Sequence, residues 1–170
     1  ERYRIDEAAQ APDAVLVRSA DMHGMEAPQS LLAVARAGAG YNNIPVNEYT
    51  KLGVCVFNTP GANANAVAEL VLLGLLLSGR RVVDGIEWAR ALKGREGVSG
   101  LVEKGKGQFA GPELRGKTLG VIGLGAIGIL VANAAAQGLG MTVLGEDPFI
   151  SVQHAWSLSR AVPRVDSVEE

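Results

Sequence analysis

The sequence predicts an α/β fold, in which parallel strands alternate with helices. Short apolar runs, each followed by Gly, Asn or Asp, recur through the first sixty residues, and the second half contains a strand, a glycine-rich turn and a helix in succession. Glycine is also abundant: it makes up 22 of the 170 residues, which is nearly twice the share of about 7% found in ordinary proteins. The backbone is therefore expected to turn tightly or to approach a neighbour closely at many points.

Three apolar runs in the first part of the chain predict strands: AVLV at 14–17, LLAVA at 31–35 and VCVF at 54–57. Between the second and third runs, residues 45–53 predict a short helix that Pro45 starts and Gly53 ends. Cys55 lies within the third run. We expect its thiol to be buried and inert, because no histidine or other base flanks it.

The second part of the chain begins with a different pattern. Residues 63–92 predict one long helical stretch, for which Asn63 or Asn65 is the expected N-cap. Residues 93–112 are polar and glycine-rich, and predict a loop with at most one helical turn. The tail from residue 151 onward shows no clear period.

The turn-rich residues 58–61 separate these two patterns, so we place a domain boundary there. The prediction is one partial domain over residues 1–60 and a second over residues 61–170. A chain of 170 residues is long enough for one full domain or two small partial ones.

Charge and composition narrow the expected partners. The chain has 16 basic and 18 acidic residues and a net charge of -2, which argues against nucleic acid or an anionic membrane surface as a general partner. Residues 118–145 carry no charge, but this run contains 7 Gly and fits a buried βαβ unit better than a membrane span. The single cysteine and the absence of a signal-peptide pattern suit the cytoplasm. A small molecule or another subunit is the expected partner.

A glycine-rich motif marks the strongest candidate site. The apolar run at 119–122 passes directly into Gly123-Leu124-Gly125-Ala126-Ile127-Gly128, which opens an alanine-rich helical segment. The three glycines of this G-x-G-x-x-G pattern have separate steric roles. Gly123 makes the tight turn, Gly125 lets a pyrophosphate approach the backbone, and Gly128 allows the helix to pack closely on the strand. The free N–H groups of the helix N-terminus then face the phosphates.

A carboxylate at the expected spacing accompanies this motif. The apolar run at 141–144 predicts a second strand, and Asp147 follows it, 19 residues after Gly128. An acid at this distance binds the adenosine ribose hydroxyls and repels a 2′-phosphate, so NAD is favoured over NADP. Glu146 is a rival for this contact, because alternation along the strand points only one of the two inward. A packed glycine turn without a ligand is the alternative, but strand, helix, second strand and acid together favour a nucleotide site.

Several segments carry a resemblance that extends over nearly the whole chain: LVRSADMHG, ARAGAGYNNIPV, VFNTPGANANAVAELVLLGLLL, LRGKTLGVIGLGAIG and GEDPFIS. In this order and spacing they resemble the D-2-hydroxyacid dehydrogenase family. The resemblance implies part of a flavodoxin-like α/β substrate domain, joined to part of a Rossmann-type cofactor domain with a parallel sheet. It also implies hydride transfer between a nicotinamide and C2 of a small anionic 2-hydroxy acid, and a homodimer formed through the cofactor domain.

The resemblance also assigns binding residues. Arg18 matches the arginine that helps to hold the anionic substrate, and a guanidinium can bind a carboxylate or phosphate with two parallel hydrogen bonds. Gly38-Ala39-Gly40 matches the loop whose N–H groups bind the substrate carboxylate, and its middle residue, Ala39, matches a cofactor contact. Without the resemblance, a surface arginine and a plain turn at a strand end would be the simpler readings.

In the nucleotide motif, the resemblance places Ala126 and Ile127 under the pyrophosphate and Asp147 at the ribose. The sequence departs from the family pattern at two positions. Many members have Arg or His where Ala126 stands, and an aromatic residue where Glu146 stands. The first departure removes a cationic contact, and the second adds a negative charge beside the ribose site.

The resemblance implies no catalytic residue within this chain. The family's catalytic Arg, Glu and His are expected after residue 170, and the settings of His23 and His154 do not match that of the catalytic histidine. The chain alone is therefore expected to be inactive, and no metal site is predicted. Two alternatives stay open, namely a dehydrogenase for another 2-hydroxy acid, and a non-enzymatic NAD-sensing or corepressor-like protein on the same fold.

Overall fold

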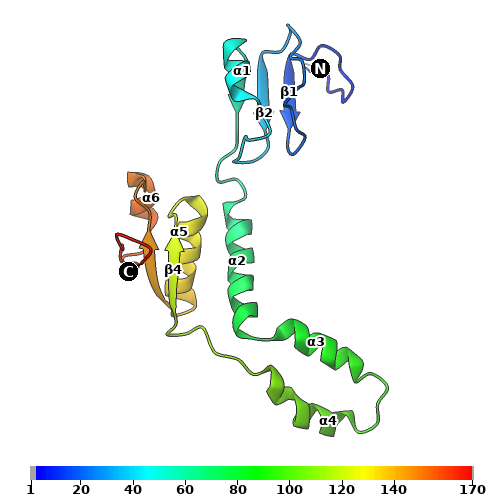
Figure 1. Ribbon diagram of the computed structural model, residues 1–170, viewed down its shortest axis with the longest axis vertical. Helices are drawn as coiled ribbons and strands as arrows, with labels where there is room; N and C mark the ends of the chain where they lie inside the picture. The colour runs from blue at the N-terminus through cyan, green and yellow to red at the C-terminus, as the bar shows by residue number, and fades with distance from the viewer. Residues whose placement is uncertain (1–2, 170) are drawn as a thin grey trace. The chain divides into compact units, whose positions relative to one another are not determined.

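The computed structural model describes residues 3–169, and the chain divides into two units, residues 1–63 and 64–170. Figure 1 labels most of their helices and strands. All strand pairs in both units are parallel among the described residues, and helices connect successive strands. The predicted α/β fold class is therefore confirmed.

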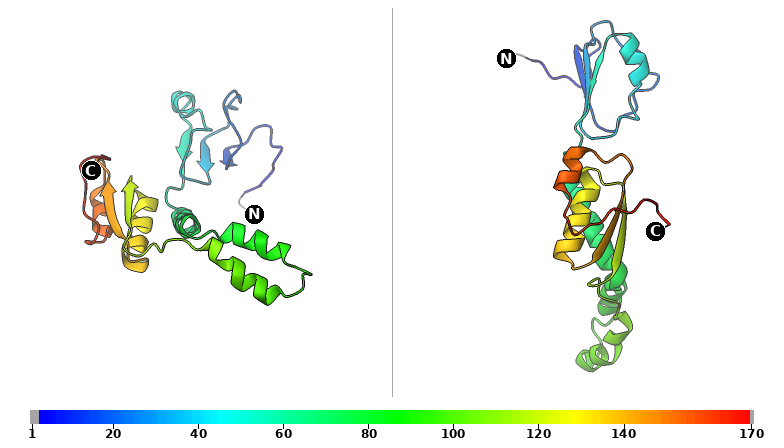
Figure 2. Two further views of the ribbon diagram at one scale, coloured as in Figure 1. Left: turned by 60° about the horizontal axis from the view of Figure 1, so that its bottom comes forward. Right: turned by 90° about the vertical axis from the view of Figure 1, so that its left-hand side faces the viewer.

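Unit 1 is a three-stranded parallel sheet in the order β1-β2-β3. Its elements are β1 (Ala14–Val17), β2 (Ala33–Arg36), α1 (Val46–Lys51) and β3 (Cys55–Phe57), and Figure 2 shows α1 on one face of the sheet. The fully buried Val34 lies at the centre of β2, paired with Val15 on one side and Val56 on the other. A small core forms between the sheet and α1, made of Met22, Leu31, Val34, Ile44, Tyr49 and Val54.

The helix of unit 1 begins and ends where the sequence predicts. Pro45 precedes its first residue, and Gly53 follows its C-cap with a φ of 76°. The N–H of Gly53 donates to the Thr50 carbonyl oxygen, and the N–H of Val54 donates to that of Tyr49. This pair of bonds is the Schellman pattern, in which a residue with positive φ closes the helix.

The expectation of a buried Cys55 is wrong, because the side chain is exposed. Along β3, only Val56 is partly buried, and its neighbours Cys55 and Phe57 lie on the other face of the sheet. Among the described residues of unit 1, only one face of this sheet packs against a helix. Alternation along the strand therefore decides the exposure of the thiol, rather than the apolar character of the run.

Unit 2 contains a second parallel sheet, formed by β4 (Thr118–Ile122) and β5 (Thr142–Glu146). The helix α5 (Ala126–Asn133) connects the two strands and continues as the π-helix η2 (Ala134–Gly138). After α6 (Val152–Ser157), the chain returns beside β5, where Gly145 forms a parallel bridge with Arg164. The order β4, β5 and returning segment corresponds to one half of a doubly wound sheet.

The core of unit 2 lies between this sheet and α5. Its fully buried centre includes Ala132 and Ala135 on the helical side and Val143 on β5. Helix α2 (Ala64–Gly79) packs against α5, and Figure 1 shows α5 between α2 and the sheet. The small residues of α5 thus allow packing on both sides of the helix.

The predicted single helix over 63–92 is two helices, α2 and α3 (Val82–Ala91). The chain turns at Gly79, where an added Cβ would lie 2.9 Å from the carbonyl oxygen of Pro112. This close approach of the returning chain leaves no space for a side chain where α2 ends. Helix-forming residues on both sides of Gly79 favour a single helix in the sequence, and the contact that breaks it comes from a distant segment.

The predicted loop over 93–112 is largely helical, with α4 (Val98–Gly105) and the 3-10 helix η1 (Lys106–Phe109). Figure 1 and the left-hand view of Figure 2 show α3 and α4 side by side as a hairpin. The rings of Trp88 and Phe109 pack with centroids 5.2 Å apart, and an added Cβ at Gly105 would collide with the Trp88 ring. Aromatic packing across the hairpin therefore overrides the low helix propensity of its glycines.

The tail for which no period was evident contains the helix α6. Its N-cap is Ser151, whose side chain accepts a hydrogen bond from the N–H of His154 at 3.2 Å. Asn133 on α5 also fixes this region, donating to the Ser157 carbonyl oxygen and accepting from the N–H of Ser159. A helix of six residues is too short for periodicity to reveal.

Candidate functional site

The turn from β4 into α5 depends on glycine at its first position. Gly123 has a φ of 87°, which disfavours other residues. Its N–H donates to the Glu146 carbonyl oxygen at 2.8 Å, so the turn begins beside the carboxyl end of β5. The two strands thus end at the same edge of the sheet, where ligands of doubly wound folds bind.

The other two glycines of the motif have contrasting surroundings. An added Cβ at Gly128 would collide with the carbonyl oxygen of Gly123, so the first turn of α5 lies directly against the turn that precedes it. An added Cβ at Gly125 would meet nothing within 4 Å. Gly125 also has a φ of -77°, which any residue adopts. Protein packing therefore requires a glycine at residue 128, whereas at residue 125 the space is open.

The start of α5 presents backbone donors to this open space. The N–H groups of Gly125, Ala126 and Ile127 find no acceptor in the described part of the chain. Three free donors at a helix N-terminus, combined with the helix dipole, favour an anion there. Because Ala126 has no cationic side chain, the backbone supplies the positive potential at this position.

The carboxylate of Asp147 faces the glycine-rich turn. Its Oδ2 accepts from the N–H of Leu124 at 2.8 Å, and its Oδ1 accepts from the N–H of Phe149 at 2.9 Å. In the sheet, Glu146 pairs with Ile122, and the Ile122 side chain is 67% exposed. Alternation places the Glu146 side chain on the opposite face of the sheet from Gly145. Asp147 is thus the acid beside the glycine-rich turn.

A second cluster lies at the carboxyl edge of the sheet in unit 1. Arg18 follows β1, the Gly38–Gly40 turn follows β2, and Asn58 follows β3. Because the strands are parallel and adjacent, these three segments meet at one edge. The sheet therefore brings together the predicted substrate residues Arg18, Gly38, Ala39 and Gly40.

Arg36 links two parts of this cluster. Its Nε donates to the Arg18 carbonyl oxygen at 3.0 Å, and its guanidinium lies where a Cβ at Gly38 would be. Gly38 has a φ of 154°, which also favours glycine. Arg36 therefore fixes the end of β1 against the turn after β2, and it leaves the Arg18 side chain exposed.

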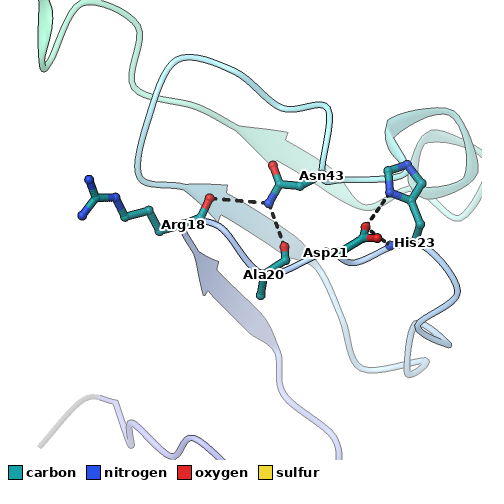
Figure 3. A network of polar contacts seen from close by, with 5 residues as sticks. All are labelled: Arg18, Ala20, Asp21, His23 and Asn43. Carbon is teal, nitrogen blue, oxygen red and sulfur yellow. Dashed lines mark hydrogen bonds and ion pairs between the residues drawn. The ribbon is translucent and has the colours of Figure 1, made fainter. Parts of the chain in front are cut away.

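Figure 3 shows the contacts that hold the segment after β1. The Asn43 amide donates to the Ala20 carbonyl oxygen at 2.8 Å and to that of Arg18 at 3.5 Å. The Arg18 side chain points away from this network. Sequence reasoning did not assign roles to Asn43, Arg36 or Asn58. Arg36 and Asn58 each stand directly at the end of an apolar run, which is the available signal, whereas Asn43 lies in the following loop and carried none.

Asp21 and His23 form an exposed pair beside this network. The His23 N–H donates to Asp21 Oδ1 at 3.0 Å, and the His23 ring nitrogen Nδ1 lies 2.7 Å from the same oxygen. The backbone hydrogen bond first, and the side-chain contact second, hold the pKa of the Asp21 carboxyl below its ordinary value of 3.8. The resulting contribution to stability is present above pH 3.8 and is lost as the pH falls through the lowered pKa.

Replacing His23 with alanine should raise the pKa of Asp21 toward its ordinary value. The rise is partial, because the backbone N–H of residue 23 still donates to the carboxylate. A carbon-13 NMR titration of the carboxyl groups measures it, with His154→Ala as the matched control, which should leave Asp21 unchanged. Equal Asp21 titrations in wild type and His23→Ala would contradict this account of the pair.

None of the helices within residues 3–169 combines the length and the apolar character that a membrane span requires. Nor does residue range 3–169 contain a group of three or more His, Cys, Asp or Glu side chains placed to hold a metal ion.

A glycine-rich turn between the first strand and helix, with a carboxylate at the end of the second strand, defines the Rossmann-type class of fold. The chain also matches the family model described as D-isomer specific 2-hydroxyacid dehydrogenase, catalytic domain, over residues 2–164. The chain belongs to the D-2-hydroxyacid dehydrogenase family. This confirms the family resemblance of its motifs.

Individual relatives agree with this assignment. The chain is 38% identical over 146 residues to a D-3-phosphoglycerate dehydrogenase of Archaeoglobus fulgidus, which covers 84% of this chain and 26% of that protein. Among solved structures, it resembles apo D-mandelate dehydrogenase of Rhodotorula graminis, with 34% identity and a TM-score of 0.64, over 84% of this chain and 40% of that one. It also resembles an acyclic imino acid reductase in complex with NADPH and D-arginine, with 26% identity and a TM-score of 0.68, over 91% and 46% of the two chains. The chain thus spans about a quarter of the curated relative and less than half of each solved chain.

Proposed function

We propose that this chain is part of an NAD-dependent D-3-phosphoglycerate dehydrogenase, which oxidises 3-phosphoglycerate to 3-phosphohydroxypyruvate on the way to serine. In this proposal, unit 1 is the partial substrate domain and unit 2 is the partial cofactor domain. The observation that carries it is the Asp147 carboxylate beside the free N–H groups at the start of α5. The name of the Archaeoglobus fulgidus relative supports the choice of substrate.

The residues of unit 2 fit a dinucleotide. The open space at Gly125 leaves room for a pyrophosphate, whose charge the N–H groups of Ala126 and Ile127 would offset. Asp147 would accept hydrogen bonds from the ribose hydroxyls, and its charge would repel a 2′-phosphate. For this reason we propose NAD, although one structural neighbour contains NADPH. NAD, when bound, supplies the acceptor for the hydride that leaves C2 of the substrate.

The residues of unit 1 fit a small anion. Arg18 carries an exposed guanidinium at the end of β1, and the N–H groups of Ala39 and Gly40 have no acceptor within residues 3–169. We propose that these groups bind the substrate carboxylate. His23 bonds to Asp21 at an exposed position, so we assign it no part in moving the proton from the substrate hydroxyl.

The proposal includes a cytoplasmic homodimer that forms through unit 2. Helix α2 exposes apolar side chains within that unit, among them Leu70 at 67%, Leu73 at 49% and Leu76 at 45%. Burial of such a surface by a second copy is favourable, because apolar area leaves water. The lone cysteine is consistent with a reducing compartment.

The test measures cofactor binding and turnover separately. The 170-residue chain should quench or shift NADH fluorescence on binding, bind NADPH more weakly, and show no reduction of NAD with 3-phosphoglycerate.

The complete reading frame, assayed with 3-phosphoglycerate, lactate, glycerate and mandelate, should prefer the phosphorylated acid. Equal activity on the other acids would support the alternative of another 2-hydroxy acid, for which the structural similarity to D-mandelate dehydrogenase is the favouring observation. NADH binding without activity on any acid would support an NAD-sensing role.

A further inference from the structure

The turn after β2 is held from one side by the segment after β3. The side-chain amide of Asn58 donates to the Ala39 carbonyl oxygen at 2.7 Å, and the N–H of Thr59 donates to the Gly38 carbonyl oxygen at 3.0 Å. Two consecutive carbonyl groups of the turn therefore face the same neighbouring segment.

Because the peptide bond is planar, the direction of these two carbonyl groups also fixes the direction of the N–H groups in the same peptide units. The described residues contain no cis peptide bond, and in a trans peptide the C=O and N–H groups point in opposite directions. Because the Gly38 and Ala39 carbonyls face residues 58–59, the N–H groups of Ala39 and Gly40 face away from them. Both residues are exposed, and neither N–H has an acceptor in the part of the chain that the structure describes.

We propose that Asn58 is a positioning residue that, together with the backbone N–H of Thr59, aims the N–H groups of Ala39 and Gly40 at the substrate anion. This inference rests on the proposed function of the turn, because it assumes that these two donors bind the substrate carboxylate. Successive free N–H groups at a turn form a concave anion site. Asn58 holds the peptide group between Ala39 and Gly40 and so directs the Gly40 N–H. The Thr59 N–H holds the peptide group between Gly38 and Ala39 and so directs the Ala39 N–H.

The chemistry of asparagine suits this role. The bond to Ala39 requires a side-chain donor, which asparagine has and an ionised aspartate lacks. Asn58→Asp therefore nearly preserves the shape of the side chain and removes the bond, whereas Asn58→Ala removes both the bond and the amide. Thr59 still donates in either variant, so the turn keeps one of its two bonds.

The first test measures the order of the turn without ligand. Nitrogen-15 relaxation of the 170-residue chain should give order parameters near 0.85 for Ala39 and Gly40 in wild type, falling toward about 0.6 in Asn58→Ala and Asn58→Asp. Asn47→Ala, an exposed position on α1, is the control and should leave both values unchanged. Unchanged amide signals from β2 and β3 establish that the variants are folded. Order parameters that stay at the wild-type value in both Asn58 variants would overturn the proposal.

The second test measures binding of D-3-phosphoglycerate through the amide shifts of Ala39 and Gly40. A single lost hydrogen bond predicts a Kd about 3- to 10-fold higher in Asn58→Ala, with no change in Asn47→Ala. Equal Kd values in wild type and Asn58→Ala would overturn the positioning role while leaving the substrate assignment intact. If wild type binds without shifting these amides, the proposed function of the turn fails, and the inference fails with it.

Discussion

Replacing Asp147 with alanine is expected to weaken NADH binding by about tenfold or more. A hydrogen bond to a charged group contributes about 1.5–3 kcal/mol, and each 1.4 kcal/mol is about a factor of ten. The substitution also removes the acceptor for the N–H of Leu124, which lies within the glycine-rich turn. Both effects act in the same direction, because the carboxylate is both the predicted partner of the ribose and an anchor of the turn.

Fluorescence titration of the 170-residue chain with NADH and NADPH measures this effect. The matched control is Glu146→Gln, because Glu146 is adjacent in sequence but belongs to the opposite face of the sheet. The control should change NADH affinity by no more than about twofold, a small part of one hydrogen bond to a charged group. In Asp147→Ala the preference for NADH over NADPH should fall, since the repulsion of the 2′-phosphate is lost. Equal NADH affinity in wild type and Asp147→Ala would disprove the ribose assignment.

Replacing Gly128 with alanine is expected to lower the free energy of unfolding. Replacing Gly125 with alanine is expected to weaken NADH binding and to leave the stability almost unchanged. At Gly128, the added methyl group collides with the backbone carbonyl of Gly123, which no side-chain rotation relieves. Overpacking of this kind costs about 1–3 kcal/mol of the free energy of unfolding. At Gly125, the methyl group enters open space at an unstrained φ, so the change should stay within about 0.5 kcal/mol.

For NADH binding, Gly125→Ala is the variant with the expected effect. The methyl group in Gly125→Ala occupies the space predicted for the pyrophosphate, so its NADH affinity should fall by about tenfold, as for a loss of about 1.4 kcal/mol, with normal stability. Urea unfolding followed by the amide signals of β5 measures stability, and NADH fluorescence measures binding. A stable Gly125→Ala variant that binds NADH as wild type does would show that the open space is not the cofactor site.

Much of unit 1 was predictable because its elements are local. The strand over Ala14–Val17 has the bounds of its apolar run, and the helix after Pro45 ends at the glycine that closes it. Exposure was less predictable, as Cys55 shows. An apolar run does not reveal which face of a sheet is covered.

The errors in unit 2 arose where distant segments decide the local structure. The break after Gly79 reflects the approach of Pro112, and the helix in the glycine-rich segment reflects packing between Trp88 and Phe109. Neither contact leaves a periodic signal. The nucleotide motif was recognisable because its steric requirements fall within six consecutive residues. The bond from Asn58 to Ala39 spans 19 residues and required the structure.

The backbone contact between Gly79 and Gly111 has a consequence for how the family can vary. An added Cβ at Gly111 would collide with the Gly79 carbonyl oxygen, so the two ends of the helical hairpin meet. The chain leaves the end of α2 at Gly79 and returns beside it at Gly111, and β4 begins only after that return. The length and surface of the hairpin can therefore change without shifting the register of the sheet.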